Sequence, residues 1–334
     1  MTFAPQAVTP PDDLEDLLRA LDASRAEVGR VLIGQQEVIR LVLTSMMAGG
    51  HALLEGPPGA GKTLLVQTLG EVTGLNATRI QFTPDLMPAD ITGSTVLAQT
   101  KDGGRSLQFQ PGPIFTQLLL ADEINRATPR TQSALLEAMQ ERTVSVGGES
   151  MKLPTPFFVL ATQNPIEMEG TYNLPEAQID RFLLRIPVAY PSEQILSEIL
   201  LATTGQRDTV VQQKITPPQI ERLQELVRAV VIAQDLRDAV ARLALMTQPH
   251  SARATPETNR FIRFGLSPRG AQALVLSAKA NALLEGRYNV DFSDIRSVLA
   301  SATHHRIQLN FEGRAERVDL DAFILDLFER AVRT

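Results

Sequence analysis

One eight-residue run constrains the fold of this chain more than any other feature. Residues 56–63 read Gly-Pro-Pro-Gly-Ala-Gly-Lys-Thr, which matches the pattern of a phosphate-binding loop. The apolar residues 51–54 before it predict a buried strand, and residues 64–69 after it predict a helix that ends at Gly70 or Gly74. A loop between a buried strand and a helix predicts a phosphate site on an α/β fold.

The residues of this loop are chemically suited to hold a nucleotide. Glycines let successive backbone N–H groups point at phosphate oxygens, and the start of the next helix adds a partial positive charge. We expect the Lys62 ammonium to contact the β- and γ-phosphates and the Thr63 hydroxyl to ligate Mg²⁺. The alternative is a flexible turn that matches by chance, and its flanking strand and helix disfavour it. The predicted nucleotide contacts here are Gly56, Pro57, Pro58, Gly59, Ala60, Gly61, Lys62, Thr63 and Leu64.

Polar residues follow two further apolar runs. Residues 118–121 lead into Asp122 and Glu123, and residues 157–162 lead towards Asn164. Two carboxylates at a strand end suit metal binding by Asp122 through water and polarisation of an attacking water by Glu123. Asn164 follows its strand at a place where a neutral side chain could orient that water. An ordinary solvated strand end is the alternative for the acidic pair, and the phosphate loop upstream disfavours it.

Arginines at predicted helix ends are candidate phosphate contacts. Residues 176–182 predict a short helix that ends at Arg181, which fits the edge of a subunit interface. Residues 266–269 predict an N-cap serine, a proline at the first helical position and Arg269 in the first turn. The helix dipole disfavours a cation there, so an anion opposite Arg269 would explain its presence. Three other arginines could approach phosphate: Arg126, Arg130 and Arg185.

Longer strings of sequence identify a family. They occupy residues 82–93 (Phe-Thr-Pro-Asp-Leu-Met-Pro-Ala-Asp-Ile-Thr-Gly), 161–167 (Ala-Thr-Gln-Asn-Pro-Ile-Glu) and 169–182. With the motifs above, they make the chain resemble the MoxR family of AAA+ ATPases from about Val31 onward. The resemblance implies a Walker A loop at Gly56–Thr63, Walker B at Leu118–Glu123, sensor 1 at Asn164, an arginine finger at Arg181 and sensor 2 at Arg269.

The resemblance also implies the fold and its division. We expect an AAA+ P-loop NTPase core with a parallel sheet flanked by helices, followed by a smaller all-α lid domain. The expected parts are a mobile N-terminal arm over 1–11, the α/β core over 12–190 and the helical lid over 191–334. Two inserted hairpins are expected, around 94–109 and 143–153, the first with a turn at 101–104. They would border a central pore, and the alternative is a pair of surface hairpins without client contact.

One short segment before the phosphate loop resembles the part of the family that covers the adenine. Ile33 and Gly34 are therefore the expected base contacts. A helix cap with a buried isoleucine is an equally weighted alternative.

Composition narrows the remaining function classes. The net charge of −6 and pI of about 5.4 disfavour a general nucleic-acid binder. With no cysteine, a thiol nucleophile and a zinc-thiolate site are excluded. The N-terminus lacks the features of a signal peptide and no apolar run of about 18 residues could span a bilayer, so we expect a cytoplasmic location.

We therefore expect an ATPase that binds ATP and Mg²⁺, forms a homo-oligomeric ring, expected to be a hexamer, and acts as a chaperone for partner proteins. The resemblance suggests protein clients or partners with von Willebrand factor A domains. A nucleic-acid-dependent AAA+ motor related to replicative helicases is the alternative. A GTP-dependent switch is disfavoured because residues 162–165 read Thr-Gln-Asn-Pro and supply no Asn-Lys-x-Asp base-reading motif.

Overall fold

The structure is a computed structural model that describes residues 11–99, 104–164, 171–204 and 210–333. Most of the predicted N-terminal arm, the hairpin turn at 101–103 and the family string at 165–170 lie outside these ranges. The chain divides into two compact units, residues 27–221 and residues 1–26 with 222–334. This division by compactness does not test the predicted domain boundaries at 11 and 190, which stay predictions.

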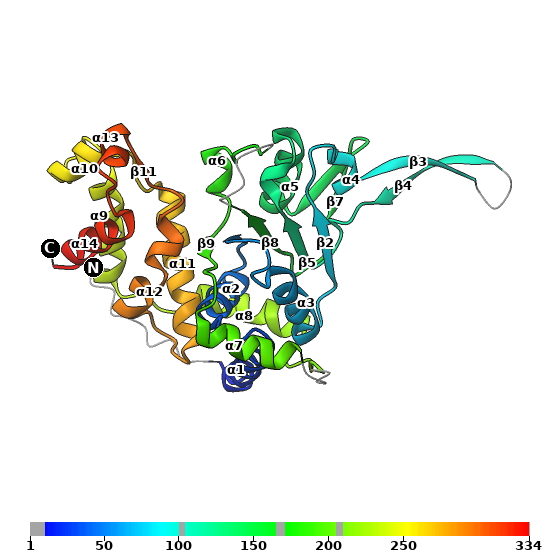
Figure 1. Ribbon diagram of the computed structural model, residues 1–334, viewed down its shortest axis with the longest axis horizontal. Helices are drawn as coiled ribbons and strands as arrows, with labels where there is room; N and C mark the ends of the chain where they lie inside the picture. Colours follow the sequence, from blue (N-terminus) through cyan, green and yellow to red (C-terminus); the bar gives the residue numbers. More distant parts are fainter. Residues whose placement is uncertain (1–10, 100–103, 165–170, 205–209, 334) are drawn as a thin grey trace. The chain divides into compact units, whose positions relative to one another are not determined.

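A five-stranded parallel sheet forms the centre of unit 27–221, in the order β2-β5-β8-β1-β9 (Figure 1). The strands are β1 (Ala52–Glu55), β2 (Ala77–Gln81), β5 (Leu118–Asp122), β8 (Phe158–Gln163) and β9 (Leu184–Pro187). Every residue of β5 is buried, as expected for a central strand covered on both faces. Because all five strands are parallel, their carboxyl ends lie along one edge of the sheet.

Helices of this unit precede, connect and follow the strands of the sheet (Figure 1). They are α2 (Gln36–Met47), α3 (Lys62–Thr73), α4 (Pro88–Thr92), the 3₁₀ turn η1 (Ile124–Arg126), α5 (Pro129–Glu141), α6 (Glu176–Ile179) and α7 (Glu193–Thr203). Helix α3 ends at Gly74, whose φ of 66° is the left-handed conformation that glycine adopts without a side-chain clash. Gly70 lies inside α3 and is buried, so the first of the two predicted ends is wrong. An apolar cluster that includes Phe82, Leu119 and Phe157 packs β5 and β8 against α5.

His51, directly before β1, is part of this core. Its Nδ1 accepts a hydrogen bond from the Val159 N–H (3.0 Å), so its Nε2 carries the proton and donates to the Met139 carbonyl oxygen (3.1 Å). The ring also stacks on Phe158. Burial lowers the pKa of His51 from 6.5 to about 4, so the imidazole is neutral near pH 7 and has a structural role.

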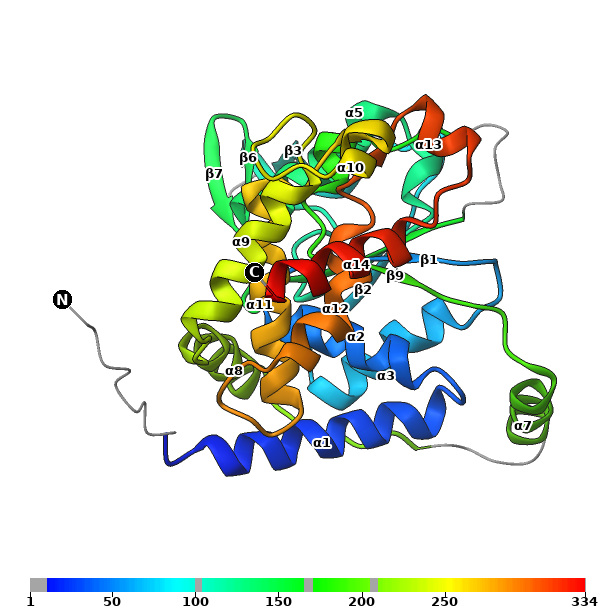
Figure 2. The same ribbon diagram turned by 90° about the vertical axis from the view of Figure 1, so that its left-hand side faces the viewer.

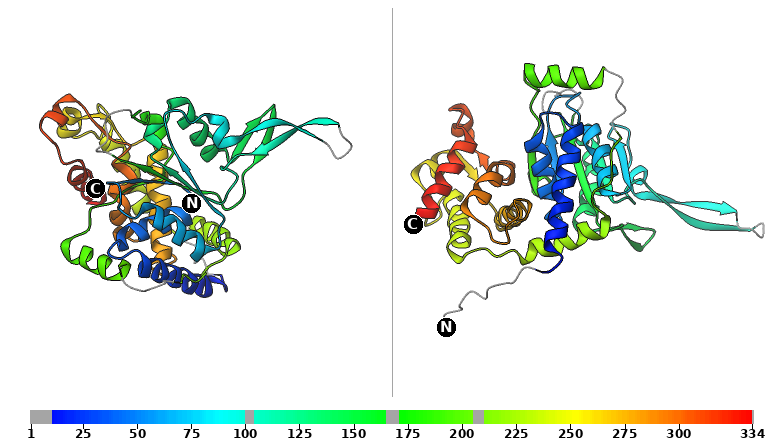
Figure 3. Two further views of the ribbon diagram at one scale, coloured as in Figure 1. Left: turned by 45° about the vertical axis from the view of Figure 1, so that its right-hand side comes forward. Right: turned by 90° about the horizontal axis from the view of Figure 1, so that it is seen from below.

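Two antiparallel hairpins extend from this unit at the predicted places. The first pairs β3 (Gly93–Gln99) with β4 (Arg105–Pro111), and the second pairs β6 (Thr143–Val146) with β7 (Glu149–Lys152). Gly147 and Gly148 both have positive φ, which suits the two-residue turn of the second hairpin. Figure 3 shows the first hairpin reaching well beyond the sheet. Its side chains Val96, Leu97 and Leu107 are exposed.

In its described residues, the other unit is helical apart from one short strand pair. Its helices are α9 (Gln234–Thr247), α10 (Pro256–Phe261), α11 (Pro268–Leu284), α12 (Phe292–Thr303), α13 (Phe311–Ala315) and α14 (Leu320–Arg333). Helix α11 packs on α9 and α12, and α14 packs on the same two helices (Figure 2). Strand β10 (Ile262–Phe264) pairs antiparallel with β11 (Gln308–Leu309), a short pair within the predicted all-α lid. Helices α1 (Leu14–Val31) and α8 (Pro217–Ala229) have residues in both units.

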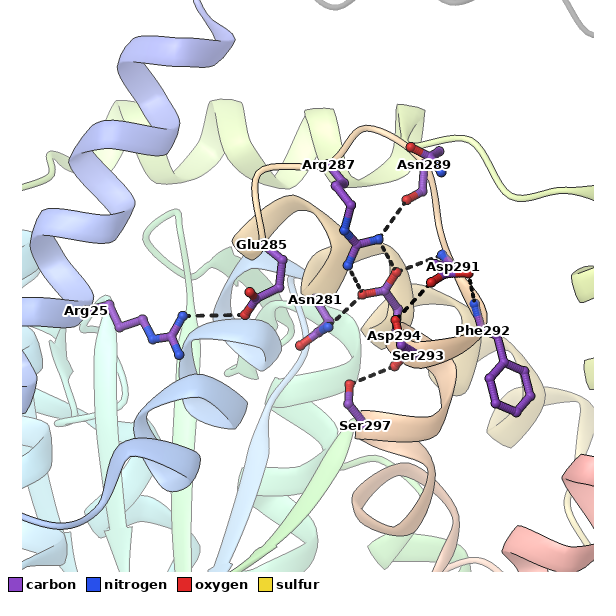
Figure 4. A network of polar contacts seen from close by, with 10 residues as sticks. All are labelled: Arg25, Asn281, Glu285, Arg287, Asn289, Asp291, Phe292, Ser293, Asp294 and Ser297. Carbon is purple, nitrogen blue, oxygen red and sulfur yellow. Dashed lines mark hydrogen bonds and ion pairs between the residues drawn. The ribbon is translucent and has the colours of Figure 1, made fainter.

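A buried carboxylate joins α11 to α12 (Figure 4). Asp294 accepts hydrogen bonds from both terminal nitrogens of Arg287 (2.7 and 2.6 Å) and from the Asn281 amide (2.8 Å). It also accepts one from the backbone N–H of Asp291, the N-cap of α12, which completes a capping box. Burial raises the pKa of Asp294, but these hydrogen bonds outweigh burial and hold that pKa below its ordinary value. The charged network therefore fixes the carboxyl-terminal part of α11 to the start of α12.

None of the helices in the described ranges is both long and apolar enough to cross a membrane.

Candidate functional site

The phosphate-loop motif lies between β1 and α3, as the sequence predicts. The Gly56 N–H donates to the carbonyl oxygen of Gln163 at the end of β8 (3.3 Å). A side chain at Gly56 would meet the Val188 carbonyl oxygen at 2.4 Å, so only glycine fits there. Gly59 and Gly61 both have a φ of 78°, and no described atom lies within 4 Å of an ideal Cβ built on Gly59. The loop thus has its required backbone turn and an open side.

The start of α3 brings a cation to this loop. Lys62 is the first residue of α3, and its ammonium donates to the Gly56 carbonyl oxygen (2.8 Å). Thr63 follows it in the first turn, and Leu64 is exposed. The Gln35 amide donates to the Ala60 carbonyl oxygen (2.9 Å) and steadies the loop from outside. Glycines in this conformation, a lysine and the start of a helix together fit a bound phosphate group.

A cavity of about 550 Å³ lies beside the loop. Its walls come from the segment before α2, the loop itself, α3 and α7, and Ile33 is one of the lining residues. Gly34 contributes a turn with a φ of 77°, where a side chain would meet Ile195 at 2.4 Å. The walls of the cavity are mostly apolar, and Gln67, Thr68 and Glu71 add polar groups to them. This mixture suits a flat polar ring such as a nucleobase.

The acidic pair stands at the end of β5, next to β8 in the sheet. The buried Thr162 hydroxyl of β8 donates to Asp122 Oδ1 (2.6 Å) and accepts a hydrogen bond from the Glu123 N–H (2.8 Å). Glu123 has a φ of 56°, the left-handed conformation that residues other than glycine rarely adopt. The backbone there turns from β5 into η1.

Basic and amide side chains surround the acidic pair on its other side. Arg79 of β2 donates to Asp122 Oδ2 from Nε (3.1 Å) and from Nη2 (2.7 Å). The same Nη2 donates to Gln81 Oε1 (2.7 Å), and the Gln81 amide donates to Glu123 Oε2 (2.7 Å). Arg126 of η1 also donates to Glu123 Oε2 (2.8 Å). Sequence reasoning missed Arg79, Gln81 and Thr162, because their role depends on strand pairing: β2 places Gln81 opposite Asp122.

The two residues expected beyond β8 lie in the same unit. Asn164 follows β8 directly and is buried. Helix α6 ends at Ile179, two residues earlier than predicted, and Arg181 lies half-buried in the turn after it. The Arg181 N–H donates to the Gln178 carbonyl oxygen (3.1 Å), which makes this turn a tight continuation of the helix.

The other arginines have separate surroundings. Arg269 belongs to the second unit, at the second position of α11, where Ser267 caps the helix by accepting the Gly270 N–H (3.1 Å). The predicted cap is therefore confirmed, and the Arg269 side chain is exposed. Arg185 of β9 pairs with Glu55 at the end of β1, and Arg130 is exposed at the start of α5. Within unit 27–221, the geometry brings together the loop, Thr162 and the acidic pair.

Comparisons with known proteins agree with this arrangement. A model of the ATPase family associated with various cellular activities (AAA) matches residues 51–184, and an AAA lid domain model matches residues 255–326. Chaperone MoxR1 of Mycobacterium tuberculosis is 38% identical and covers 96% of this chain and 85% of its own. Protein MoxR of Paracoccus denitrificans is 36% identical and covers 88% of this chain and 90% of its own. A solved structure from Cytophaga hutchinsonii has a TM-score of 0.88 and 35% identity, and the match covers 95% of this chain and 96% of that one.

Proposed function

This chain belongs to the MoxR family of AAA+ ATPases, and on that premise we propose that it uses ATP and Mg²⁺ to remodel or mature partner proteins as a ring-forming chaperone. Membership in the family supports ATPase activity directly. The choice of a chaperone is supported by the name of the relative Chaperone MoxR1. A cytoplasmic location stays a prediction.

One observation carries the proposal: a line of hydrogen bonds crosses three neighbouring strands from the phosphate loop to the acidic pair. Gly56 at the end of β1 bonds to Gln163 of β8, and Thr162 of β8 bonds to both Asp122 and Glu123 at the end of β5. The loop and the carboxylates are therefore both held by the end of β8. A phosphate held by the loop would have metal-binding and water-activating groups at the same edge of the sheet.

We assign roles to these residues from their chemistry. The loop N–H groups and the Lys62 ammonium would hold the phosphates, and Thr63 with Asp122 would hold Mg²⁺. When bound, that ion would neutralise phosphate charge and favour attack at the γ-phosphate. Glu123 would accept a proton from the attacking water, for which its carboxylate must turn from Arg126. Asn164 would orient the same water.

The cavity beside the loop supports the base-binding part of the proposal. Ile33 lines it, and the turn at Gly34 lets the segment before α2 pass close to α7. We assign the adenine to this cavity, with Ile33 as a wall and the Gly34 backbone as the turn that shapes it.

Two arginines complete the proposed machinery. Arg181 would act as an arginine finger towards the nucleotide of a neighbouring subunit, since it is only half-buried, in a turn after α6. Arg269 would contact phosphate from the lid, because a cation in the first turn of α11 opposes the helix dipole unless an anion lies nearby. The role of Arg181 requires a ring, for which we propose a hexamer.

The proposed partners are proteins. The exposed apolar side chains of the β3–β4 hairpin are a candidate client contact, and partners with von Willebrand factor A domains are the suggested class. The chain offers no residue pattern that names the client.

Two variants separate nucleotide binding from hydrolysis. Lys62→Ala should lose ATP binding in a fluorescent-nucleotide titration, because the loop loses its only full charge on the phosphates. Glu123→Gln should bind ATP normally and release phosphate on the order of 10² times more slowly, the effect of losing a general base. Glu141→Gln, an exposed glutamate at the end of α5, is the matched control and should behave as wild type.

The outcomes distinguish the alternatives. Wild-type turnover by Glu123→Gln would overturn the assignment of the water-activating group. Strong stimulation of phosphate release by DNA at low salt would favour the nucleic-acid motor instead. Proteins that co-purify with the ATP-loaded Glu123→Gln ring, and are absent with Lys62→Ala, would identify the client.

A further inference from the structure

Arg79 is the one side chain in the described ranges that is hydrogen-bonded both to Asp122 and to the amide that holds Glu123. We propose that Arg79 is a positioning residue that competes with the divalent cation for Asp122. Binding of the metal ion is then linked to the release of Asp122 and Glu123 from the hydrogen bonds that Arg79 makes or supports. This inference rests on the proposed function, because it takes Asp122 as a metal ligand.

Most acceptor positions on Asp122 are already occupied. Its two oxygens offer about four lone pairs. Thr162 uses one on Oδ1, and Arg79 places two N–H groups on Oδ2. The Asp122 side chain is only 11% exposed, so water has little access to what remains. Oδ2 cannot serve a metal ion or its water ligands fully while Arg79 stays in this position.

The Arg79 side chain can move away from Asp122 while the Asp122 carboxylate keeps its orientation. The Arg79 side chain is 51% exposed, so its guanidinium can return to water at small cost. Asp122 keeps the Thr162 hydrogen bond from the neighbouring strand, which holds its orientation without Arg79. A guanidinium and a divalent cation at one carboxylate also repel each other. These effects favour competition over assistance.

Arg79 also acts on Glu123, through the Gln81 amide. Arg79 donates to Gln81 Oε1, which leaves the Gln81 NH₂ group to face Glu123 Oε2. Of the hydrogen bonds described above, only the one from Arg79 fixes Gln81 Oε1, so the Gln81 amide loses its fixed orientation when Arg79 departs. Glu123 then retains the Arg126 contact and loses a firmly oriented donor. Metal uptake at Asp122 would thereby loosen the carboxylate that has to activate water.

Metal affinity tests the competition without measuring activity. The dissociation constant of Mn²⁺ is measured by electron paramagnetic resonance of free Mn²⁺, on the full chain saturated with ADP. Arg79→Met keeps much of the side-chain length and removes the charge. We expect about fivefold tighter Mn²⁺ binding, corresponding to the roughly 1 kcal/mol upper range for a half-exposed ion pair. Arg79→Lys keeps the charge and should stay within about twofold of wild type.

Two controls make the result specific. Arg126→Met removes a neighbouring arginine that contacts Glu123 rather than Asp122, and it should change the Mn²⁺ affinity by less than Arg79→Met. In an Asp122→Asn background, Arg79→Met should give no gain, because the carboxylate for which the two cations compete is gone. Circular dichroism checks that each variant is folded, and Arg79→Gln replaces Arg79→Met if that variant unfolds.

The outcomes are distinct for the two proposals. Unchanged or weaker Mn²⁺ binding by folded Arg79→Met would overturn the competition, as would an equal gain in Arg79→Lys. A gain that persists with Asp122→Asn would also overturn it. A wild-type protein that binds ADP and no Mn²⁺ would instead contradict the metal site of the proposed function.

Discussion

The buried network around Asp294 makes a measurable contribution to the stability of the helical unit. Asp294→Asn keeps the shape of the side chain and removes its charge. The Asp294 side chain is 1% exposed, whereas that of Arg287 is 36% exposed. Breaking a buried ion pair costs about 3–5 kcal/mol, but water can rehydrate the partly exposed Arg287, so we expect a loss of about 2–3 kcal/mol. A weaker capping box at the start of α12, where an amide oxygen replaces a carboxylate, is part of that figure.

The assay has a global and a local readout. Urea unfolding followed by circular dichroism gives the free energy of unfolding, and hydrogen exchange of α11 and α12 amides locates the loss. Because the pKa of Asp294 is depressed in the fold, its stabilisation is fully present above the ordinary carboxyl pKa of about 4 and is lost as pH falls through the lower folded value. The difference between the variant and wild type should therefore shrink towards pH 2.

A double-mutant cycle decides whether the two charges act together. Arg287→Met should also destabilise, and Asp294→Asn with Arg287→Met should cost less than the sum of the single changes. Additivity within about 0.5 kcal/mol would refute the coupling. Full protection of α11 in Asp294→Asn would show that the network does not fix this helix.

Two further predictions concern the other unit and the ring. Arg181→Ala should keep nucleotide affinity and lower the rate of hydrolysis by roughly 10³-fold. Mixing it with Lys62→Ala subunits should restore part of the activity. No recovery in proven mixed rings would contradict action between subunits. The free energy of unfolding should fall by about 3 kcal/mol as pH drops from 6.5 to about 4, because the unfolded chain takes up a proton that folded His51, with its pKa lowered to about 4, does not. His51→Gln should lack this part of the pH dependence, and an unchanged pH profile in that variant would contradict it.

The features that the sequence predicted correctly are those encoded in contiguous residues. The phosphate-loop motif, the buried strand before it, the helix after it and the Ser267 cap each have a local pattern that needs no partner strand. The expectation of a parallel sheet flanked by helices came from the family resemblance, and the structure has such a sheet. The roles of Asn164, Arg181 and Arg269 stay predictions.

The features that escaped prediction depend on which strands pair and in what register. Arg79 and Gln81 look like ordinary outward residues of an edge strand until β2 is aligned with β5. Strands β10 and β11 have three and two residues, too few for an alternating pattern to appear. Helix α6 ends before Arg181 because the chain turns at residue 180, and the helical pattern of residues 176–182 contains no stop signal there.

The left-handed backbone of Glu123 has a consequence for anyone who wants to capture a client. At a φ of 56°, a residue with a Cβ carries a conformational cost of about 1 kcal/mol or more, which glycine would not carry. Glu123→Gly would relax the turn between β5 and η1 and so change the backbone of the site as well as its side chain. Glu123→Gln keeps the left-handed backbone conformation and the side-chain volume. It is therefore the better variant for trapping the ATP-bound state, because it stops hydrolysis without changing the turn.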